Sequence, residues 1–175
     1  NIHIIGLLSD GGVHSHIEHF MGIADIAAAK GKEVFLHLIT DGRDVSPTSA
    51  QKYIKKVEEH LSENVKIATI SGRFYSMDRD SRWERIQRGY EAIVHANPKT
   101  DNTPAGYIGS SYSLGETDEF VAPTAFEGYD GFKEGDSVLT INFRSDRMRE
   151  MVSAIGDSTF SNFVRSHINV NIATI

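Results

Sequence analysis

The chain has 175 residues, of which 39% are hydrophobic and 24% are charged, values typical of one globular domain with a sizeable core. Its formal net charge of −6 excludes an overall positive field that would attract nucleic acid or an anionic membrane, and the absence of cysteine excludes disulfides, thiolate nucleophiles and cysteine-ligated metals. No apolar run approaches the roughly 18 residues of a membrane-spanning helix. We therefore expect a soluble protein that binds neither nucleic acid nor a membrane. The absence of cysteine fits a cytoplasmic protein, and we also expect it to be monomeric.

The first part of the chain alternates strand-like runs with amphipathic helices. Residues 4–8 form an apolar run typical of a buried strand, and a second strand is predicted at residues 34–39. Between them, Ser15 and Glu18 fit a capping box, which predicts that a helix begins at residue 15. Ser46-Pro47 predicts the start of the next helix, because proline is tolerated at the first helical position.

The rest of the chain repeats this plan less regularly. Two further strands and a last helix are predicted at residues 65–70, 138–143 and 146–155. Ser81 and Glu84 fit a second capping box at the start of a helix that follows the third strand. Residues 104–133 scatter glycine, serine and tyrosine without a clear period, so their structure is not predicted.

Strands separated by helices predict right-handed crossovers and a mainly parallel sheet. The expected fold is therefore α/β, a three-layer αβα sandwich. Asn1 leads directly into an apolar run, and residues 168–175 alternate like a strand with no polar terminator. We expect residues 1–175 to be a single domain excised from a longer protein, the alternative being a trimmed form of a complete one.

Arginines gather in the segments that follow the predicted strands. In parallel sheets, ligands bind outside the carboxyl ends of the strands. Half of the ten arginines of the chain lie in those segments, namely Arg43, Arg73, Arg79, Arg144 and Arg147. Two like charges about 4 Å apart repel by roughly 4 kcal/mol at an effective dielectric constant near 20, and arginine does not deprotonate. The cluster therefore favours a site for a small carboxylate or phosphate ligand; the alternative is a surface network in which each arginine pairs with a neighbouring aspartate.

Two other side chains are candidates for binding or proton transfer. His14 follows a flexible Gly-Gly turn and is placed to hydrogen-bond a hydroxyl or phosphate. Together with His16 and His19 it also suggests a metal site, although His16 is better placed to start a helix. Asp44, next to Arg43, is a candidate acid–base group, and a helix cap or Asx-turn is an equally good interpretation.

Five blocks of sequence carry a resemblance to a known family. They are Leu7-Leu-Ser-Asp-Gly-Gly-Val-His-Ser-His16, Asp41-Gly-Arg-Asp44, Ser71-Gly-Arg-Phe-Tyr-Ser-Met-Asp-Arg-Asp80 with Arg82-Trp83, Thr117-Asp-Glu-Phe-Val121 and Asn142-Phe-Arg-Ser-Asp-Arg147. In order and spacing they resemble the 2,3-bisphosphoglycerate-independent phosphoglycerate mutases. A lone Asp-Gly-Arg-Asp would be a weak signal, but five blocks that span nearly the whole chain are very specific.

The resemblance implies a two-domain enzyme that interconverts 3-phosphoglycerate and 2-phosphoglycerate. In that family an alkaline-phosphatase-like domain carries two manganese ions and a serine that becomes phosphorylated, and an inserted domain holds the glycerate. This chain resembles the inserted domain, so no metal is expected in it and its partner is the phosphatase-like domain of the same polypeptide. The resemblance implies Asp44 as the proton shuttle and a set of substrate-binding residues: His14, Arg43, Asp44, Arg73, Arg79, Arg144 and Arg147.

The sequence departs from the family pattern in two ways. Ser145 replaces the proline that usually stands between Arg144 and the following aspartate, which frees the local backbone. The segments of the phosphatase-like domain have no counterpart, so we expect no turnover by this chain alone. Two alternatives remain open, a non-catalytic module that binds phosphorylated metabolites and a metal-dependent phosphohydrolase organised around the three histidines.

Overall fold

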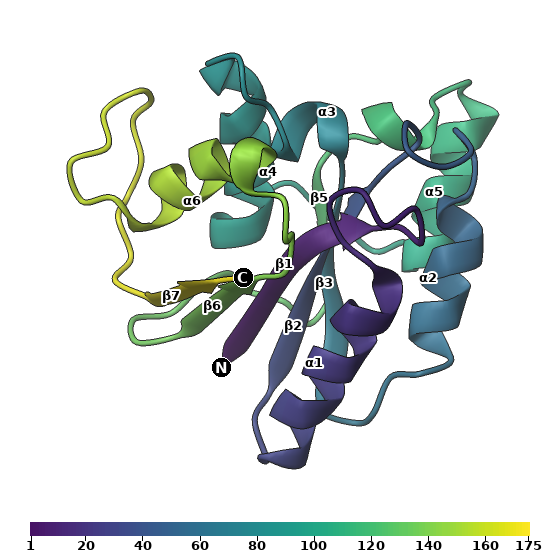
Figure 1. Cartoon of the computed structure of the whole chain (residues 1–175), viewed down its shortest axis with the longest axis horizontal. Coiled ribbons are helices and arrows are strands. Elements are labelled where there is room, and N and C mark those ends of the chain that lie inside the picture. The colour runs from purple at the N-terminus through teal and green to yellow at the C-terminus, as the bar shows by residue number, and fades with distance from the viewer.

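A seven-stranded sheet forms the centre of the computed structural model, which describes residues 1–175 (Figure 1). The strands are β1 (Ile2–Leu8), β2 (Val34–Thr40), β3 (Val65–Gly72), β4 (Lys99–Thr100), β5 (Thr124–Phe126), β6 (Ser137–Thr140) and β7 (Asn171–Thr174). Their order in the sheet is β4-β5-β3-β2-β1-β6-β7. Every neighbouring pair is parallel except β3 with β5. The predicted, mainly parallel α/β sheet is confirmed.

Helices cover both faces of the sheet, so the predicted three-layer sandwich is also confirmed (Figure 1). One face carries α1 (Ile17–Ala29), α2 (Ala50–Glu58) and α5 (Pro104–Ser113). The other carries α4 (Trp83–His95) and α6 (Arg149–Gly156). Three short helices follow or cover the carboxyl ends of the strands: α3 (Arg73–Ser76), η1 (Asp118–Phe120) and η2 (Ser145–Arg147).

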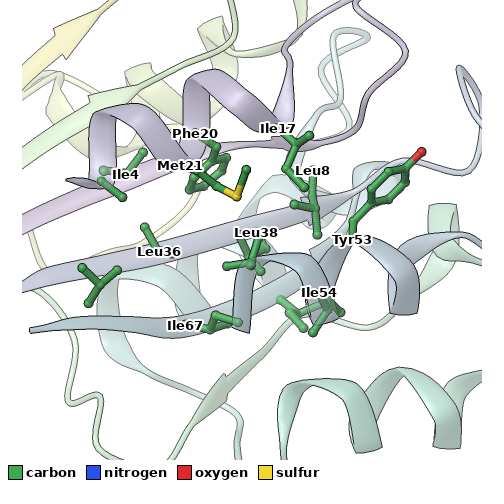
Figure 2. Close-up of a cluster of buried hydrophobic side chains, with 14 of the residues drawn as sticks. Ile4, Leu8, Ile17, Phe20, Met21, Leu36, Leu38, Tyr53, Ile54 and Ile67 are labelled. Atoms are coloured by element: carbon green, nitrogen blue, oxygen red, sulfur yellow. The ribbon is translucent and has the colours of Figure 1, made fainter. Parts of the chain in front are cut away.

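The strands read as nearly continuous apolar runs because both faces of the sheet are buried. Along β1, Ile4 and Leu8 pack with α1 and α2, while Ile5 and Leu7 pack with α4 and α6. Figure 2 shows the first of these layers, in which Phe20 of α1 lies over the sheet. The parallel pairing of β1 with β2 and β6, and of β2 with β3, places the carboxyl ends of these strands at one edge of the sheet.

Both predicted capping boxes are wrong. The hydroxyl of Ser15 donates to the carbonyl of Leu7, and the N-cap of α1 is His16, whose Nδ1 accepts from the backbone N–H of Glu18 at 3.3 Å. Ser81 has a positive φ of 60° and donates its backbone N–H to Glu150 at 2.9 Å. Each serine is hydrogen-bonded to a residue of another element, Leu7 or Glu150, and does not cap the helix that follows it. His16 does begin the helix, as the sequence indicated.

The start of α2 also differs from the prediction. The helix begins at Ala50, three positions beyond Pro47. Its first N–H groups are capped by the carboxylate of Asp118, whose Oδ2 accepts from the N–H groups of Ser49 at 2.8 Å and Ala50 at 2.9 Å. The cap therefore comes from the part of the chain whose structure was not predicted, which forms α5, η1 and β5.

The fourth predicted strand is shorter than expected. β6 ends at Thr140, because the chain then turns out of the sheet and the side chain of Asn142 accepts from the N–H of Leu7 at 2.9 Å. The predicted helix at residues 146–155 is split into η2 and α6. No helix has both the length and the apolar character needed to cross a membrane.

Candidate anion-binding site

A cavity of about 340 Å³ lies at the carboxyl edge of the sheet, between the segments that follow β2, β3 and β6 and helix η1. We call it the arginine pocket, and its lining residues are Arg43, Arg73, Phe74, Met77, Asp78, Asp80, Arg82, Arg85, Glu119, Phe120 and Arg147. Three of the five predicted arginines, Arg43, Arg73 and Arg147, therefore line one cavity. Its volume suits a small polar metabolite.

Arg73 is the buried centre of the site. Its Nη1 donates to Oδ1 of Asp41 at 2.5 Å and to Oδ2 of Asp44 at 2.7 Å. Burial alone would lower the pKa of Arg73, but hydrogen bonds to these two carboxylates outweigh burial and raise it. Asp41 also accepts from the N–H groups of Arg43 and Asp44, both at 3.1 Å. The Asx-turn that was weighed for Asp44 is thus made by Asp41, which leaves the Asp44 carboxylate beside Arg73.

His14 lies against the same guanidinium and is buried. Nη2 of Arg73 lies 3.2 Å from Nε2 of His14, and because a guanidinium only donates, Nε2 must be the acceptor. Burial, followed by the charge of Arg73, lowers the pKa of His14. The neutral ring then carries its proton on Nδ1, a buried atom with no hydrogen-bond partner. An unpartnered buried donor beside an arginine is suited to a ligand oxygen.

Arg79 and Arg144 lie outside the cavity lining and share one carboxylate. Oδ2 of Asp146 accepts from Arg79 at 2.7 Å and from Nη2 of Arg144 at 3.2 Å, and Oδ1 accepts from Nε of Arg144 at 3.0 Å. Burial would raise the pKa of Asp146, but the two arginines outweigh it and lower the pKa. Oδ1 of Asp146 also lies 3.9 Å from Nδ1 of His14, so this group adjoins the one around Arg73.

Arg147 differs from the other predicted arginines because it has no carboxylate partner. Its Nη1 donates to the carbonyl of Met77 at 3.1 Å, and it makes no ion pair, whereas each of the other four makes at least one. Burial lowers the pKa of Arg147, and the neighbouring charges of Arg79, Arg73 and Arg43 lower it further. The structure therefore brings all seven predicted residues to one edge and leaves one guanidinium uncompensated.

Several pocket residues were not predicted as site residues. Arg85 stacks on Phe74, with its guanidinium carbon 3.8 Å from the ring centroid, and Arg82 donates to Asp78 at 3.2 Å. Glu119 and Phe120 enter from η1. Arg82 and residues 117–121 lay in the blocks that resemble the family, but nothing in their residue types alone marked them as pocket residues.

The three histidines do not converge on one point. His14 contacts Arg73 and His16 caps α1, while His19 lies near His16 with 5.8 Å between the ring centroids. No group of three or more His, Cys, Asp or Glu side chains has the arrangement of a metal site. The histidines therefore do not fit the donor set that the metal-dependent alternative requires.

Comparison with known proteins decides the family. A family model described as the N-terminus of the BPG-independent PGAM proteins matches residues 1–175, the whole chain. The chain belongs to the bisphosphoglycerate-independent phosphoglycerate mutase family. A 2,3-bisphosphoglycerate-independent phosphoglycerate mutase of Sulfurimonas denitrificans is 70% identical over 174 residues, covering 99% of this chain and 35% of that protein. One from Aliarcobacter butzleri is 50% identical over 175 residues, covering 100% of this chain and 36% of that protein.

A solved structure supports the same assignment. The crystal structure of Leishmania mexicana phosphoglycerate mutase at low cobalt concentration aligns with a TM-score of 0.92 and 32% identity, over 99% of this chain and 35% of that chain. The fold is therefore that of one part of a phosphoglycerate mutase. The chain spans about a third of the length of these relatives.

Proposed function

We propose that this chain is the substrate-holding domain of an enzyme that interconverts 3-phosphoglycerate and 2-phosphoglycerate. Family membership supports the reaction class, an isomerisation, and the arginine pocket supports the ligand class. The observation that carries the proposal is the pocket wall itself, where Arg147 has no carboxylate partner. Next to this wall, the ring of His14 lies against Arg73, and its buried Nδ1 has no hydrogen-bond partner. Both features are suited to a ligand with anionic oxygen atoms.

Each predicted residue has a role in the proposal. Arg147 and Arg43 would bind the phosphoryl or carboxylate oxygens through charge-assisted hydrogen bonds, the interaction that planar guanidinium groups make best. His14 would donate from Nδ1, and Arg79 and Arg144 would supply positive charge from the side of Asp146. Such preorganised donors position a phosphorylated substrate and stabilise the charge that develops as its phosphoryl group moves.

Asp44 would move the proton. Its side chain is 21% exposed, its Oδ2 is held 2.7 Å from Arg73, and the same atom lies 3.8 Å from Nε2 of His14. We assign to this carboxylate, which is fixed against the pocket residue Arg73, the role of accepting the proton of the glycerate hydroxyl that attacks phosphorus and of returning it to the glycerate oxygen that is released. In the full enzyme the phosphoryl group would rest on a serine of the phosphatase-like domain.

The same proposal assigns the metal chemistry to another part of the enzyme. Two manganese ions, bound by the phosphatase-like domain, would supply the electrostatic stabilisation of phosphoryl transfer, and the residues of this chain do not form a metal-ligand group. Turnover would therefore require both domains of one cytoplasmic polypeptide. This chain would contribute binding, orientation and proton transfer.

Isothermal titration calorimetry of the 175-residue chain with 3-phosphoglycerate tests the proposal. Hydrogen bonds to charged groups contribute about 1.5–3 kcal/mol, so Arg147→Gln should weaken binding by about tenfold to a hundredfold. Arg149→Gln is the matched control, because Arg149 is exposed and lies outside the pocket lining. It should bind within about twofold of wild type. Wild-type affinity in Arg147→Gln, or no binding by the wild-type chain, would contradict the proposal.

A further inference from the structure

Glu119 is the one acidic side chain that enters the arginine pocket from outside the arginine-bearing segments. Its Oε1 accepts from Nη1 of Arg43 at 3.3 Å, and this is the only ion pair that Arg43 makes. The Glu119 side chain is 19% exposed and the Arg43 side chain is 54% exposed. An ion pair with one long contact and this much exposure is weak. A ligand with a better-placed anionic group can replace Glu119 on Arg43.

The backbone of Glu119 is held firmly in place. The N–H of Gly72 donates to the carbonyl of Val121 at 2.7 Å, and the hydroxyl of Thr40 donates to the carbonyl of Asp118 at 2.6 Å. The segment lies so close to the end of β3 that a Cβ on Gly72 would be 2.3 Å from the carbonyl oxygen of Glu119. The side chain of Glu119 is therefore tethered next to Arg43 and only its rotamer is free to change.

The other charged residues of the pocket determine how many guanidinium groups a ligand can reach while Glu119 is held beside Arg43. Arg73 is compensated by Asp41 and Asp44, and Arg82 and Arg85 pair with Asp78. Two guanidinium groups of the wall remain for a ligand, Arg43 and Arg147. Arg147 has no carboxylate partner, and Arg43 becomes available only when a ligand displaces the carboxylate of Glu119.

We infer that Glu119 is a specificity-determining residue, which competes with the ligand for Arg43 and thereby limits the negative charge that the pocket accepts. A glycerate with one phosphoryl group fits the two available guanidinium groups. A glycerate with two phosphoryl groups brings additional negative charge toward the carboxylate of Glu119, which stays tethered close to Arg43 after it is displaced. Like charges that lie close together repel. The inference rests on the proposed function and extends it to the choice among phosphorylated glycerates.

The test compares three forms of the chain, wild type, Glu119→Gln and the matched control Glu116→Gln. Glu116 lies in the same connection, makes no ion pair and does not line the pocket, so its substitution removes the same charge outside the site. Binding of 3-phosphoglycerate and of 2,3-bisphosphoglycerate is measured by titration calorimetry at low ionic strength. Circular dichroism confirms that each variant is folded.

Glu119→Gln should bind 3-phosphoglycerate about twofold to fivefold more tightly than wild type, the range expected for loss of a weak competing ion pair. The gain for 2,3-bisphosphoglycerate should be larger, and Glu116→Gln should stay within about twofold of wild type for both ligands. Unchanged or weaker binding by Glu119→Gln, or equal gains for the two ligands, would overturn the inference. No binding of either ligand by the wild-type chain would instead contradict the proposed function.

Discussion

Asp118 joins the pocket wall to α2, and its replacement gives a sharp test of that link. Its Oδ2 accepts from the N–H groups of Ser49 and Ala50 at 2.8 and 2.9 Å, and Tyr112 donates its hydroxyl to Oδ1. The residue is 1% exposed. A carboxylate at this position caps a helix from a segment 68 positions away in sequence, and the residue is next to Glu119 in the chain.

The cost of removing Asp118 follows from these contacts. Loss of a helix cap costs about 0.5–2 kcal/mol, and an unsatisfied buried hydroxyl costs about 1–3 kcal/mol. Asp118→Ala should therefore lower the free energy of unfolding by about 2–4 kcal/mol. Burial raises the pKa of Asp118 in spite of its hydrogen bonds, so a neutral side chain at this position avoids the cost of burying a charge. Asp118→Asn keeps an acceptor and should cost about 1 kcal/mol or less.

Urea unfolding followed by far-ultraviolet circular dichroism measures both values. Asp101→Ala is the matched control, because Asp101 is exposed in a loop and makes no ion pair. Its unfolding free energy should lie within about 0.5 kcal/mol of wild type. If Asp118→Ala were no less stable than Asp101→Ala, or if the asparagine and alanine variants were equally destabilised, the capping argument would be refuted.

Two further predictions concern the core and the pocket wall. Burial lowers the pKa of His3 and lowers that of His37 well below its ordinary value, so the unfolded chain takes up more protons as pH falls below about 6.5. The free energy of unfolding should therefore fall as the pH is lowered from 7 to 5. The fall should be smaller in His37→Gln than in the control His167→Gln, which replaces an exposed histidine. A wild-type free energy of unfolding that does not change over this range would contradict the prediction. Gly72→Ala places a Cβ 2.3 Å from the backbone of Glu119, so it should lower the free energy of unfolding by about 1–3 kcal/mol and weaken 3-phosphoglycerate binding. In the control Gly22→Ala, in α1, the new Cβ has no atom within 4 Å, and this variant should not destabilise the fold. Equal stability of the two alanine variants in urea would count against the close packing of the wall.

The pH dependence has a structural cause in a buried chain of hydrogen bonds. Nε2 of His3 lies 2.9 Å from Asp136, Nδ1 of His3 lies 3.0 Å from Nε2 of His37, and Nδ1 of His37 lies 3.0 Å from the hydroxyl of Thr69. Every position is satisfied when His3 donates to Asp136, His37 donates to His3 and Thr69 donates to His37. A second proton on either ring would bury a charge, and it would require Thr69, and for His3 also His37, to exchange its donor and acceptor roles.

The sequence predicted the architecture well where local pattern and burial agree. The runs around Ile4, Leu38 and Ile70 are apolar on both faces because helices cover both sides of the sheet, so they are recognisable as strands without any tertiary information. Helix starts were predicted poorly. Ser15 has the residue type of a cap, but its hydroxyl binds the carbonyl of Leu7, and α2 is capped by Asp118 from another element.

Residues 104–133 could not be assigned from sequence for a related reason. Helix α5 buries only Ile108 and Ser111 from its ten residues, so it has almost no apolar stripe that would reveal it. Its position depends on contacts with other elements, among them the hydroxyl of Tyr107 on the carbonyl of Ala122 at 3.1 Å. Such contacts have no periodic signature, and the pocket wall that this region forms was therefore missed.

The two interpretations of the arginine cluster turn out to be compatible. Arg73 pairs with Asp41 and Arg79 with Asp146, as a network of arginines and aspartates requires, but these partners come from other strand ends rather than from sequence neighbours. Such pairs hold guanidinium groups in fixed orientations before a ligand arrives, which lowers the entropy that binding has to overcome. Residue types alone do not reveal which arginine lacks a carboxylate. Only the packing of the loops leaves Arg147 unpaired. In the proposed function, the paired arginines provide fixed geometry and Arg147 provides the attraction for the ligand.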